Sequence, residues 1–274
     1  MEKHFAVIGN PIAHSLSPAM HQGGYREMGL EADYLRCEVE PHALPQAVQG
    51  LKALGFTGWN VTVPFKEQII PWLDELTPEA LRAGAVNTVK VMEDGRLLGH
   101  NTDGKGFVRS IQEELKPEKD MQVVILGAGG AAKGIAMALL PYQVKITLLN
   151  RTMERAQQLA ELINSRGGRA VAEAWGPGEW LKSAQLIVQT TSLGLKKEKY
   201  SFSLEGISPE TLVVDIIFNP WETPFLREAR ERGCRTLNGA GMLLYQGALA
   251  WEFWLGGQAP VAGMKKGLLE ALPK

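Results

Sequence analysis

The chain has 274 residues, a length that fits two domains at about 150 residues per domain. Hydrophobic residues make up 45% and charged residues 22% of the chain, which predicts a folded protein with a full core and excludes a disordered one. The 29 Lys and Arg balance 30 Asp and Glu, and the formal net charge is −1. This balance excludes the basic field that would hold nucleic acid or an acidic membrane surface.

Cysteine usage and the N-terminus both point to the cytoplasm. Cys37 and Cys234 are too few for a secreted disulfide framework and have no Cys-x-x-Cys spacing. The first apolar run ends at Gly9, too early for a signal peptide, and no apolar stretch reaches the ~18 residues of a membrane span. The five histidines show no metal-ligand spacing, so no metal is expected.

Short apolar runs alternate with amphipathic stretches in the first half of the chain, which predicts βαβ units around a parallel sheet. Strands are predicted over residues 5–8, 34–39 and 59–63, and helices over 18–28 and 43–54. Ser17 is predicted to cap the first helix, with Pro18 as its first residue. Residues 86–92 and 96–100 flank a Glu-Asp-Gly turn and predict an antiparallel hairpin at the edge of a mixed sheet.

The same alternation resumes in the second half, after a charged, Pro-containing break at residues 116–120 that marks the strongest candidate for a domain boundary. A helix over 105–115 precedes this break. Beyond it, strands are predicted over 122–126, 144–149, 186–190 and 212–217, and helices over 131–140, 153–166, 242–254 and 261–272. The chain is therefore predicted to be an α/β protein of two domains.

Residues 127–132 read Gly-Ala-Gly-Gly-Ala-Ala, a G-x-G-x-x-A motif between a predicted strand and a predicted helix. The first glycine allows the tight turn, the second lets a pyrophosphate approach the backbone, and the helix N-terminus supplies N–H donors. The alternative is a glycine required only by the turn itself. With the flanking elements in place, we predict a dinucleotide site at Gly127, Ala128, Gly129, Gly130 and Ala131.

The residues after the next predicted strand favour NADP over NAD. An NAD-binding unit offers a carboxylate there to bind the ribose hydroxyls, whereas this chain has Asn150, Arg151 and Thr152, with Arg155 one helical turn later. A guanidinium pairs with a 2′-phosphate that a carboxylate would repel. In the alternative interpretation Asn150 and Thr152 cap the next helix and Arg151 is solvated, and the two interpretations are compatible.

Polar residues in the first half stand at the ends of predicted strands, where open α/β sheets place their ligand crevices. Ser15 and Ser17 flank a helix start that can hold a carboxylate. Asn60 lies on a strand that is followed by Lys66, and Asp103 lies at another strand-to-helix turn. Taken singly, each also has a structural interpretation, such as a helix cap for Ser17 or Asp103 and a solvated charge for Lys66.

Together these segments resemble the shikimate dehydrogenase family nearly from end to end. The motifs that carry the resemblance lie at residues 9–18, 60–66 (Asn-Val-Thr-Val-Pro-Phe-Lys, unchanged), 84–88, 101–104, 150–152, 191–194 and 239–246. The resemblance implies an NADP-dependent, reversible reduction of 3-dehydroshikimate to shikimate on the pathway to chorismate and the aromatic amino acids. It also implies a homodimer.

The resemblance further implies a division of labour. Residues 1–101, completed by C-terminal helices within 239–274, would form the substrate-binding and catalytic domain, and residues 102–238 a Rossmann-type, doubly wound NADP-binding domain, with the active site in the cleft between them. Lys66 would be the proton donor and Asp103 would orient it. The remaining substrate contacts would be Ser15 and Ser17 on the carboxylate, and Asn60, Thr62, Asn87 and Gln246 on the ring hydroxyls. Besides the residues already predicted, the cofactor would contact Thr191, Ser192, Ile216, Gly239 and Met242.

Two positions depart from the family pattern. Phe218 stands in the late strand motif where the family usually has tyrosine, so it lacks a phenol that can hydrogen-bond near the substrate carboxylate. One neutral hydrogen bond is worth about 0.5–1.5 kcal/mol, and we expect weaker substrate binding rather than lost activity. Gln189 stands where asparagine is expected.

Two alternatives remain at this point. One is a relative of broader specificity that also acts on quinate, which differs by a hydroxyl on a saturated ring. The other is a non-catalytic NADP-binding sensor on the same fold. The presence of both Lys66 and Asp103 speaks against the sensor, because a sensor needs no proton donor.

Overall fold

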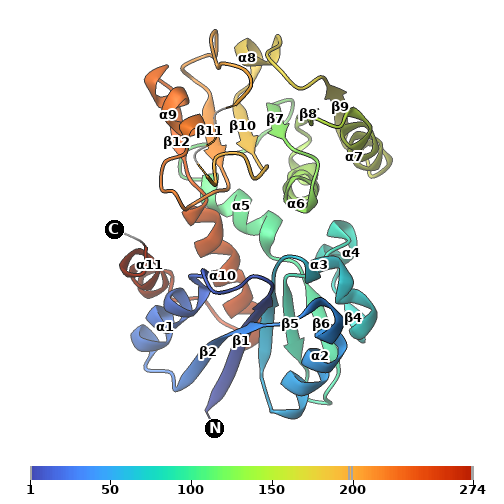
Figure 1. Cartoon of the computed structure of the whole chain (residues 1–274), viewed down its shortest axis with the longest axis vertical. Coiled ribbons are helices and arrows are strands. Elements are labelled where there is room, and N and C mark those ends of the chain that lie inside the picture. The colour runs from blue at the N-terminus through green and yellow to red at the C-terminus, as the bar shows by residue number, and fades with distance from the viewer. Residues whose placement is uncertain (1, 197, 199, 273–274) are drawn as a thin grey trace. The chain divides into compact units, whose positions relative to one another are not determined.

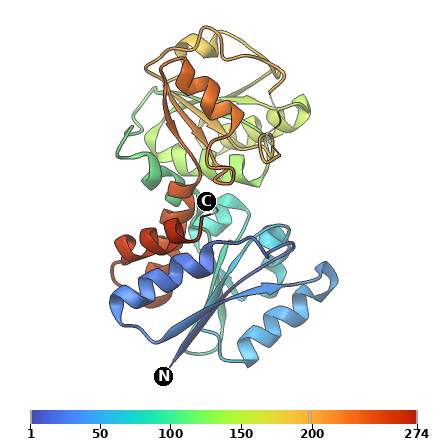
Figure 2. The same cartoon turned by 60° about the vertical axis from the view of Figure 1, so that its left-hand side comes forward.

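A computed structural model describes residues 2–196, 198 and 200–272 of the chain (Figures 1 and 2). The chain up to Gly106, together with the chain from Leu243 onward, forms one compact unit, here the first unit, and Phe107–Met242 forms the second. Residues 116–120, predicted from composition to be the boundary, instead lie within the second unit. The reason is that Phe107 and Ile111 already pack into the core of the second unit, before the charged break is reached.

The first unit contains a six-stranded sheet in the order β2-β1-β3-β5-β6-β4. Its strands are β1 (Lys3–Gly9), β2 (Ala32–Glu38), β3 (Gly58–Val61), β4 (Glu75–Leu76), β5 (Thr88–Val91) and β6 (Leu97–His100). The hairpin of β5 and β6 is antiparallel as predicted, and β5 alone runs against its neighbours. The hairpin is not the edge, however, because β4 pairs in parallel with β6 beyond it. A strand of only two residues leaves no alternating pattern to detect.

The helices of this unit include two that return from the end of the chain. They are α1 (Ser17–Met28), α2 (Leu44–Ala53), α3 (Phe65–Gln68), α4 (Pro78–Ala83), α11 (Val261–Glu270) and most of α10 (Ala240–Leu255). In Figures 1 and 2, α1 and α11 lie side by side. A Cβ on Gly23 of α1 would fall 2.2 Å from the carbonyl oxygen of Gly263 of α11, so only glycine permits this approach.

The start of α1 differs from the prediction. Ser17 does not cap the helix: the N-cap position belongs to Leu16, which makes no side-chain cap, and Ser17 is the first helical residue. Its backbone N–H instead donates to Ser15 Oγ at 3.3 Å. Because Ser17 itself has helical geometry, its hydroxyl cannot take the cap position that the sequence pattern suggested.

The second unit is a doubly wound parallel sheet in the order β12-β11-β10-β7-β8-β9. Its strands are β7 (Gln122–Leu126), β8 (Lys145–Leu149), β9 (Arg169–Glu173), β10 (Leu186–Gln189), β11 (Leu212–Asp215) and β12 (Arg235–Leu237). The strand order reverses between β7 and β10, which is where such sheets bind dinucleotides. This arrangement confirms the predicted Rossmann-type fold. β9 and β12 were missed because they are short, half-exposed edge strands.

Helices cover both faces of this sheet. They are α5 (Asp103–Ile111), which enters from the first unit, α6 (Gly130–Leu139), α7 (Met153–Ser165), α8 (Trp180–Ser183) and α9 (Pro224–Glu231). Val123 and Ile125 of β7 pack on the side of α6 and α7, whereas Val124 and Leu126 pack with α8 and α9. This alternation buries every residue of the strand after Gln122, as expected for a central strand. Among the described residues, no helix is long and apolar enough to cross a bilayer.

Candidate active site

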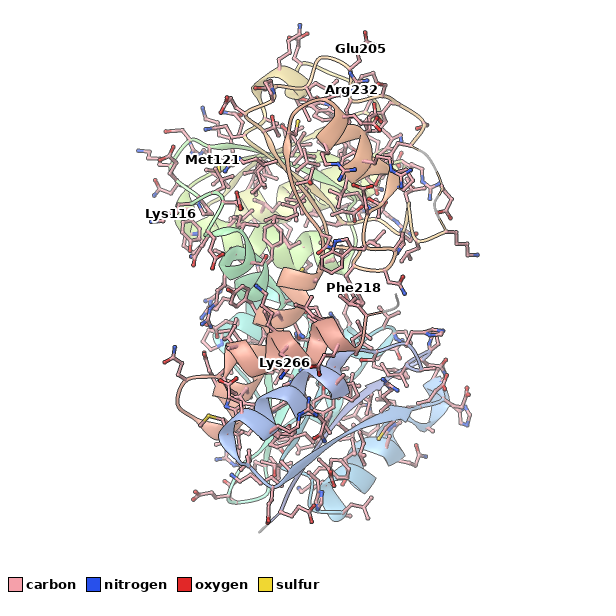
Figure 3. The ribbon with its side chains drawn as sticks, turned by 90° about the vertical axis from the view of Figure 1, so that its left-hand side faces the viewer. Lys116, Met121, Glu205, Phe218, Arg232 and Lys266 are labelled. Atoms are coloured by element: carbon pink, nitrogen blue, oxygen red, sulfur yellow. The ribbon has the colours of Figure 1, made fainter. Side chains whose placement is uncertain are left out.

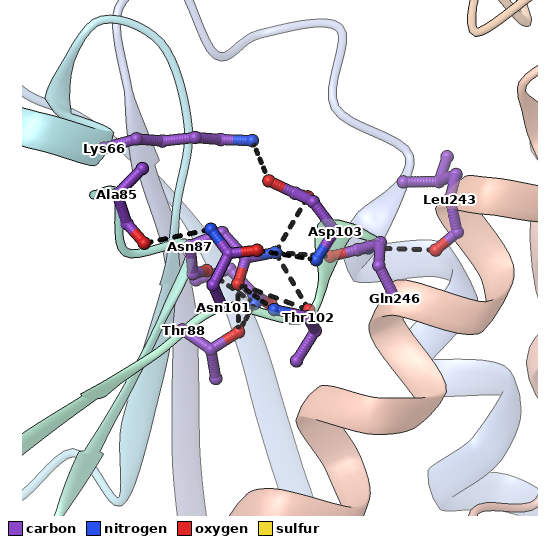
Figure 4. A network of polar contacts seen from close by, with 10 residues as sticks. Lys66, Ala85, Asn87, Thr88, Asn101, Thr102, Asp103, Leu243 and Gln246 are labelled. Carbon is purple, nitrogen blue, oxygen red and sulfur yellow. Dashed lines mark hydrogen bonds and ion pairs between the residues drawn. The ribbon is translucent and has the colours of Figure 1, made fainter. Parts of the chain in front are cut away.

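Lys66 and Asp103 form the charged centre of a polar network in the first unit (Figure 4). Lys66 lies on α3, just after β3, and Asp103 is the first residue of α5, just after β6. Lys66 Nζ is 2.6 Å from Asp103 Oδ2. The side chains are 32% and 16% exposed, so Lys66 is not the freely solvated surface charge of the alternative interpretation. An ammonium group held this way can deliver a proton to a bound ligand.

Asn87, which directly precedes β5, joins this pair to its surroundings. Its Oδ1 accepts from the backbone N–H of Thr102 at 2.8 Å and from Thr88 Oγ1 at 2.9 Å. Its Nδ2 donates to Asp103 Oδ1 at 2.9 Å and lies 3.4 Å from Gln246 Oε1. Asn87 is buried, so each of these bonds has little competition from water.

Gln246 reaches this network from the distant end of the chain, on α10. A Cβ on Gly106 of α5 would fall 2.6 Å from the Gln246 backbone nitrogen, so a glycine is needed where α5 meets α10. Gln246 Nε2 donates to the Leu243 carbonyl at 2.9 Å, which directs its Oε1 toward Asn87. The predicted residues Lys66, Asn87, Asp103 and Gln246 are therefore brought together.

Asn60 on β3 has all its polar atoms engaged. Its Nδ2 lies 3.0 Å from both the Asn87 carbonyl oxygen and Thr88 Oγ1, and its Oδ1 accepts from the Tyr34 hydroxyl at 2.6 Å. Burial, and then the neighbouring Tyr25, hold the pKa of the Tyr34 phenol well above its ordinary value, against a hydrogen bond from Ser17 that lowers it. The phenol therefore keeps its proton and acts as a donor to Asn60.

The other substrate residues predicted from the sequence lie in the same unit. Thr62, just after β3, is half-buried, and a Cβ on Gly9 would fall 2.5 Å from its Cγ2, so Gly9 makes room for the threonine. Ser15 is half-exposed, and its carbonyl oxygen accepts from Arg36 Nε at 2.9 Å. Arg36 thus brings a positive charge next to Ser15, which favours a carboxylate there.

The glycine-rich turn of the second unit leaves backbone donors open. Gly127 has φ +115°, and its Cβ would fall 2.5 Å from Thr190 Oγ1, so glycine is required at the end of β7. Gly129 occupies the N-cap of α6 without a side-chain cap, and a Cβ on Gly129 or Gly130 would meet nothing within 4 Å. An uncapped helix start beside open space fits the pyrophosphate of a dinucleotide.

Two arginines follow β8, at the position where the sequence predicts the 2′-phosphate of NADP to bind. Arg151 and Arg155 are exposed, and neither side chain makes a hydrogen bond or ion pair with another described residue. Asn150 Nδ2 donates to the Thr152 carbonyl at 2.8 Å, and Thr152 takes the N-cap position of α7 without a side-chain cap. The capping alternative for these two side chains is therefore not observed, and both guanidinium groups are available to a ligand.

Gln189, which had no assigned role in the sequence, organises the loop after β10. It is fully buried, and its Oε1 accepts from the Thr191 backbone N–H. Its Nε2 donates to the carbonyls of Thr191 at 3.1 Å and Leu193 at 3.0 Å and to Asp215 Oδ1 at 3.3 Å. Asp215 also accepts from Thr223 Oγ1 at 2.7 Å, and burial raises its pKa to about 6. Gln189 thereby ties the predicted cofactor residues Thr191 and Ser192 to β11.

The remaining predicted cofactor residues of the second unit lie around the end of β11. A Cβ on Gly239 would fall 1.9 Å from the Ile216 carbonyl oxygen, so Gly239 and Ile216 meet only because the former is glycine. Met242 packs on the core of this unit. Phe218, labelled in Figure 3, is half-buried in the loop after β11.

Three residues of the polar network were given no role from the sequence, although two of them, Thr88 and Thr102, lie within recognised motifs. Tyr34 on β2 looks like an ordinary buried strand residue, and nothing in the pattern of Thr88 or Thr102 separates a network hydroxyl from a core one. The partner of each side chain depends on strand order, which places β3 next to β5. Candidate metal sites are also absent: no group of three or more His, Cys, Asp or Glu among the described residues is placed to hold an ion.

Comparison with known proteins agrees with this geometry. The model of the shikimate dehydrogenase substrate binding domain matches residues 7–89, that of shikimate / quinate 5-dehydrogenase matches 109–216, and that of the shikimate 5′-dehydrogenase C-terminal domain matches 239–269. A shikimate dehydrogenase (NADP(+)) of Desulfitobacterium hafniense is 65% identical over 272 residues, covering 99% of each chain. The chain belongs to the shikimate dehydrogenase family.

Solved structures place the shikimate dehydrogenase fold over nearly the whole chain. The shikimate 5-dehydrogenase of Thermus thermophilus in complex with NADP(H) and shikimate is 39% identical, with a TM-score of 0.88 over 98% of this chain and 100% of that one. The ligand-free 5-ketofructose reductase of a Gluconobacter species is 36% identical, with a TM-score of 0.92 over 99% of each chain. Since proteins with different named substrates share the fold, substrate choice depends on side chains and not on the fold itself.

Proposed function

We propose that this protein is an NADP-dependent shikimate dehydrogenase that reversibly reduces 3-dehydroshikimate to shikimate, on the pathway to chorismate and the aromatic amino acids. The observation that carries this proposal is the half-buried Lys66–Asp103 pair, 2.6 Å apart and joined to Asn87. The proposal is also supported by the 65% identity of this chain to a relative named for this activity. A binding protein would have no need of a proton donor held in this way.

The substrate contacts follow from the polar groups of the first unit. Ser15 and Ser17 are proposed to hold the carboxylate, with Arg36 close by to favour the negative charge. Thr62, Asn87 and Gln246 are proposed to bind the ring hydroxyls. Asn60 stays a predicted contact of the ring hydroxyls, and its amide also bonds to Tyr34, Asn87 and Thr88 within the protein. Residues 1–101 with the C-terminal helices from 239 onward are thus proposed as the substrate-binding and catalytic part.

Lys66 is proposed to carry the proton that the reaction needs. When NADPH is bound, it supplies the hydride that adds to the ketone carbon. The ammonium group of Lys66 then stabilises the developing alkoxide and donates a proton to its oxygen, and in the oxidative direction the neutral amine takes that proton back. Asp103 Oδ2 holds Nζ in position throughout.

Residues 102–238 are proposed to bind NADP. The turn from Gly127 to Ala131 would accept the pyrophosphate at the uncapped start of α6. Arg151 and Arg155 would bind the 2′-phosphate, with Asn150 and Thr152 shaping the chain around it. On the nicotinamide side the proposed contacts are Thr191, Ser192, Ile216, Gly239 and Met242.

We also propose that the protein is a cytoplasmic homodimer. Cys37 and Cys234 are free thiols, which fits a reducing compartment. Light scattering of the purified protein is expected to give about twice the chain mass of 30.0 kDa, and a mass of one chain would contradict the dimer.

An initial-rate assay that crosses shikimate and quinate against NADP⁺ and NAD⁺ tests the proposed function. Activity with shikimate and NADP⁺ alone is expected. Comparable rates with quinate would move the protein to the relatives of broader specificity. No turnover in any combination, by protein that still binds NADP⁺, would favour the sensor and refute the enzyme.

A further inference from the structure

A continuous chain of hydrogen bonds runs from Tyr34 to Asp103 through the interior of the first unit. The Tyr34 hydroxyl is 2.6 Å from Asn60 Oδ1, and Asn60 Nδ2 is 3.0 Å from Thr88 Oγ1. Thr88 Oγ1 is 2.9 Å from Asn87 Oδ1, and Asn87 Nδ2 is 2.9 Å from Asp103 Oδ1. Its last links lie in the view of Figure 4. All members of this chain before Asp103 are buried.

The direction of every donor in this chain is fixed by groups that can play only one role. The backbone carbonyl oxygen of Asn87 can only accept a hydrogen bond, so the Asn60 side-chain atom 3.0 Å away must be Nδ2. The Thr102 backbone N–H can only donate, so the Asn87 atom that faces it must be Oδ1. Asp103 as a carboxylate can only accept, which assigns the other Asn87 atom as Nδ2.

These assignments leave the two hydroxyls no choice. Thr88 Oγ1 lies between a donor, Asn60 Nδ2, and an acceptor, Asn87 Oδ1, so its single hydrogen must point to Asn87. Asn60 Oδ1 then requires a donor, which the Tyr34 hydroxyl supplies. Every donor in the chain therefore points toward Asp103, an arrangement in which each bond strengthens the next.

We propose that Tyr34, Asn60 and Thr88 are positioning residues, which act through Asn87 to fix the Asp103 carboxylate opposite Lys66. The inference rests on the proposed function and deepens it. Asp103 is held by Lys66 at one oxygen and by Asn87 at the other. If Asn87 is free to turn its amide, the carboxylate loses one of these two restraints and Lys66 Nζ is no longer aimed at one place.

The Tyr34 end of this hydrogen-bond chain is closely packed. Tyr34 is only 4% exposed, and its ring stacks on that of His21 at 4.4 Å with an interplanar angle of 6°. His21 is completely buried, and neither of its ring nitrogens has a hydrogen-bond partner among the described residues. Burial lowers the pKa of His21 to about 3, so the ring stays neutral and no charge competes for the Tyr34 hydroxyl.

The neighbouring Tyr25 provides a matched control. Its ring lies in the same aromatic cluster, 6.1 Å from His21, and it too is buried. Its hydroxyl, however, has no hydrogen-bond partner in the part of the chain that the structure describes. Tyr34→Phe and Tyr25→Phe therefore remove the same atom from the same cluster. Only the first breaks the hydrogen-bond chain, and it also removes the contact of Tyr34 with Ser17, so the Thr88→Val variant described below is needed to separate the two effects.

Initial rates with shikimate and NADP⁺ on the full-length protein test the proposal. Tyr34→Phe is expected to lower kcat/KM for shikimate about fivefold to tenfold, the cost of one buried hydrogen bond, with KM for NADP⁺ unchanged. Tyr25→Phe is expected to stay within about twofold of wild type. Equal activity of the two variants would overturn the proposal, as would a loss in Tyr34→Phe that appears only in KM for NADP⁺.

A second variant tests the middle of the hydrogen-bond chain, and it does not require that Tyr34→Phe folds. Thr88→Val keeps the shape of the side chain and removes the hydroxyl, and it is expected to lower kcat/KM about tenfold. If Tyr34 acts through Thr88, the double variant loses no more than Thr88→Val alone, within about twofold. Losses that multiply, or wild-type activity of Thr88→Val, would refute the chain.

Different results would overturn the proposed function and the role of Tyr34, Asn60 and Thr88. A wild-type protein that does not turn over shikimate with NADP⁺ overturns the proposed function and this inference with it. An active wild type in which Tyr34→Phe behaves like Tyr25→Phe overturns the inference alone. Thermal unfolding of each variant confirms that the rates come from folded protein.

Discussion

The two units arrange their polar groups in opposite ways. In the first unit the polar side chains around Lys66 are hydrogen-bonded to one another. The side chain of Asn87, for example, is bonded to Thr88, Thr102 and Asp103. In the second unit the start of α6 has no side-chain cap, and Arg151 has no partner among the described residues. One region is satisfied before a ligand arrives, and the other keeps its donors free.

The difference follows from what each proposed ligand brings. A nucleotide carries its own phosphate charges, so exposed guanidinium groups and open backbone N–H groups gain binding energy from it directly. A proton transfer to the uncharged keto group of a small substrate depends instead on where one ammonium group points, and orientation is supplied by bonds within the protein. The sharpest tests of this contrast are variants that remove one group from each region.

The largest effect is expected for Lys66→Ala. Loss of the proposed proton donor should lower kcat about 1,000-fold, within the usual range for general acid–base catalysis, and leave KM for NADP⁺ unchanged. Lys105→Ala is the control, because Lys105 is exposed and pairs with Glu79 at 2.9 Å. Steady-state rates in both directions are the measurement, and near-normal turnover by folded Lys66→Ala would remove Lys66 from the mechanism.

The buried carboxyl of Asp215 is expected to make stability depend on pH. Its pKa of about 6 lies above the ordinary 3.8, so between these values the folded state binds more protons than the unfolded state, and stability falls as pH rises toward 6. Relative to Asp215→Asn, the wild type should lose about 2 kcal/mol of unfolding free energy as the pH rises from about 4 to about 7.

Urea denaturation at several pH values measures this difference. Asp120→Asn is the control: Asp120 is exposed, and Arg169 holds the pKa of its carboxyl below the ordinary value, so its contribution to stability should instead rise with pH. A flat difference between wild type and Asp215→Asn would show that Asp215 titrates normally in the folded protein.

Arg151→Ala tests the open region. Loss of a charge-assisted bond to the 2′-phosphate should raise KM for NADP⁺ about 10- to 100-fold and leave KM for NAD⁺ unchanged. Arg227→Ala, which removes an exposed arginine of the same unit already paired with Glu222 at 3.1 Å, is the matched control. Equal losses with both cofactors would mean that Arg151 does not recognise the 2′-phosphate.

The smallest effect is expected for Phe218→Tyr. The family resemblance places a phenol near the substrate carboxylate at this position, and restoring it adds one neutral hydrogen bond. KM for shikimate should fall about two- to tenfold while KM for NADP⁺ stays constant. A KM for shikimate that stays the same or rises would show that the missing phenol does not weaken substrate binding here.

Most of the fold and the charged residues of the site could be predicted from local sequence patterns and recognised motifs. β7, built of buried apolar residues directly before a glycine-rich turn, was placed to the residue, and Lys66 and Asp103 both stand in recognised motifs. The two-residue strand β4 could not be predicted, because nothing in so short a segment distinguishes a strand from a turn. Composition placed the boundary at residues 116–120, whereas the two units divide after Gly106, within α5.

The partners of the site residues could not be predicted, since they depend on which strands lie side by side. Tyr34 and Thr88 are far apart in the chain and meet through Asn60 because of the strand order β2-β1-β3-β5, which places β3 next to β5 and one strand away from β2. Likewise, the role of Gln189 follows from bonds to the loop after β10 and to Asp215 on β11, none of which is visible in the sequence.

The most direct test of the account is the product of one reaction. Purified protein is mixed with NADPH and 3-dehydroshikimate, and the shikimate formed is quantified by mass spectrometry against the NADPH consumed. The account predicts one shikimate for each NADPH oxidised. No oxidation, or oxidation without shikimate, would contradict it.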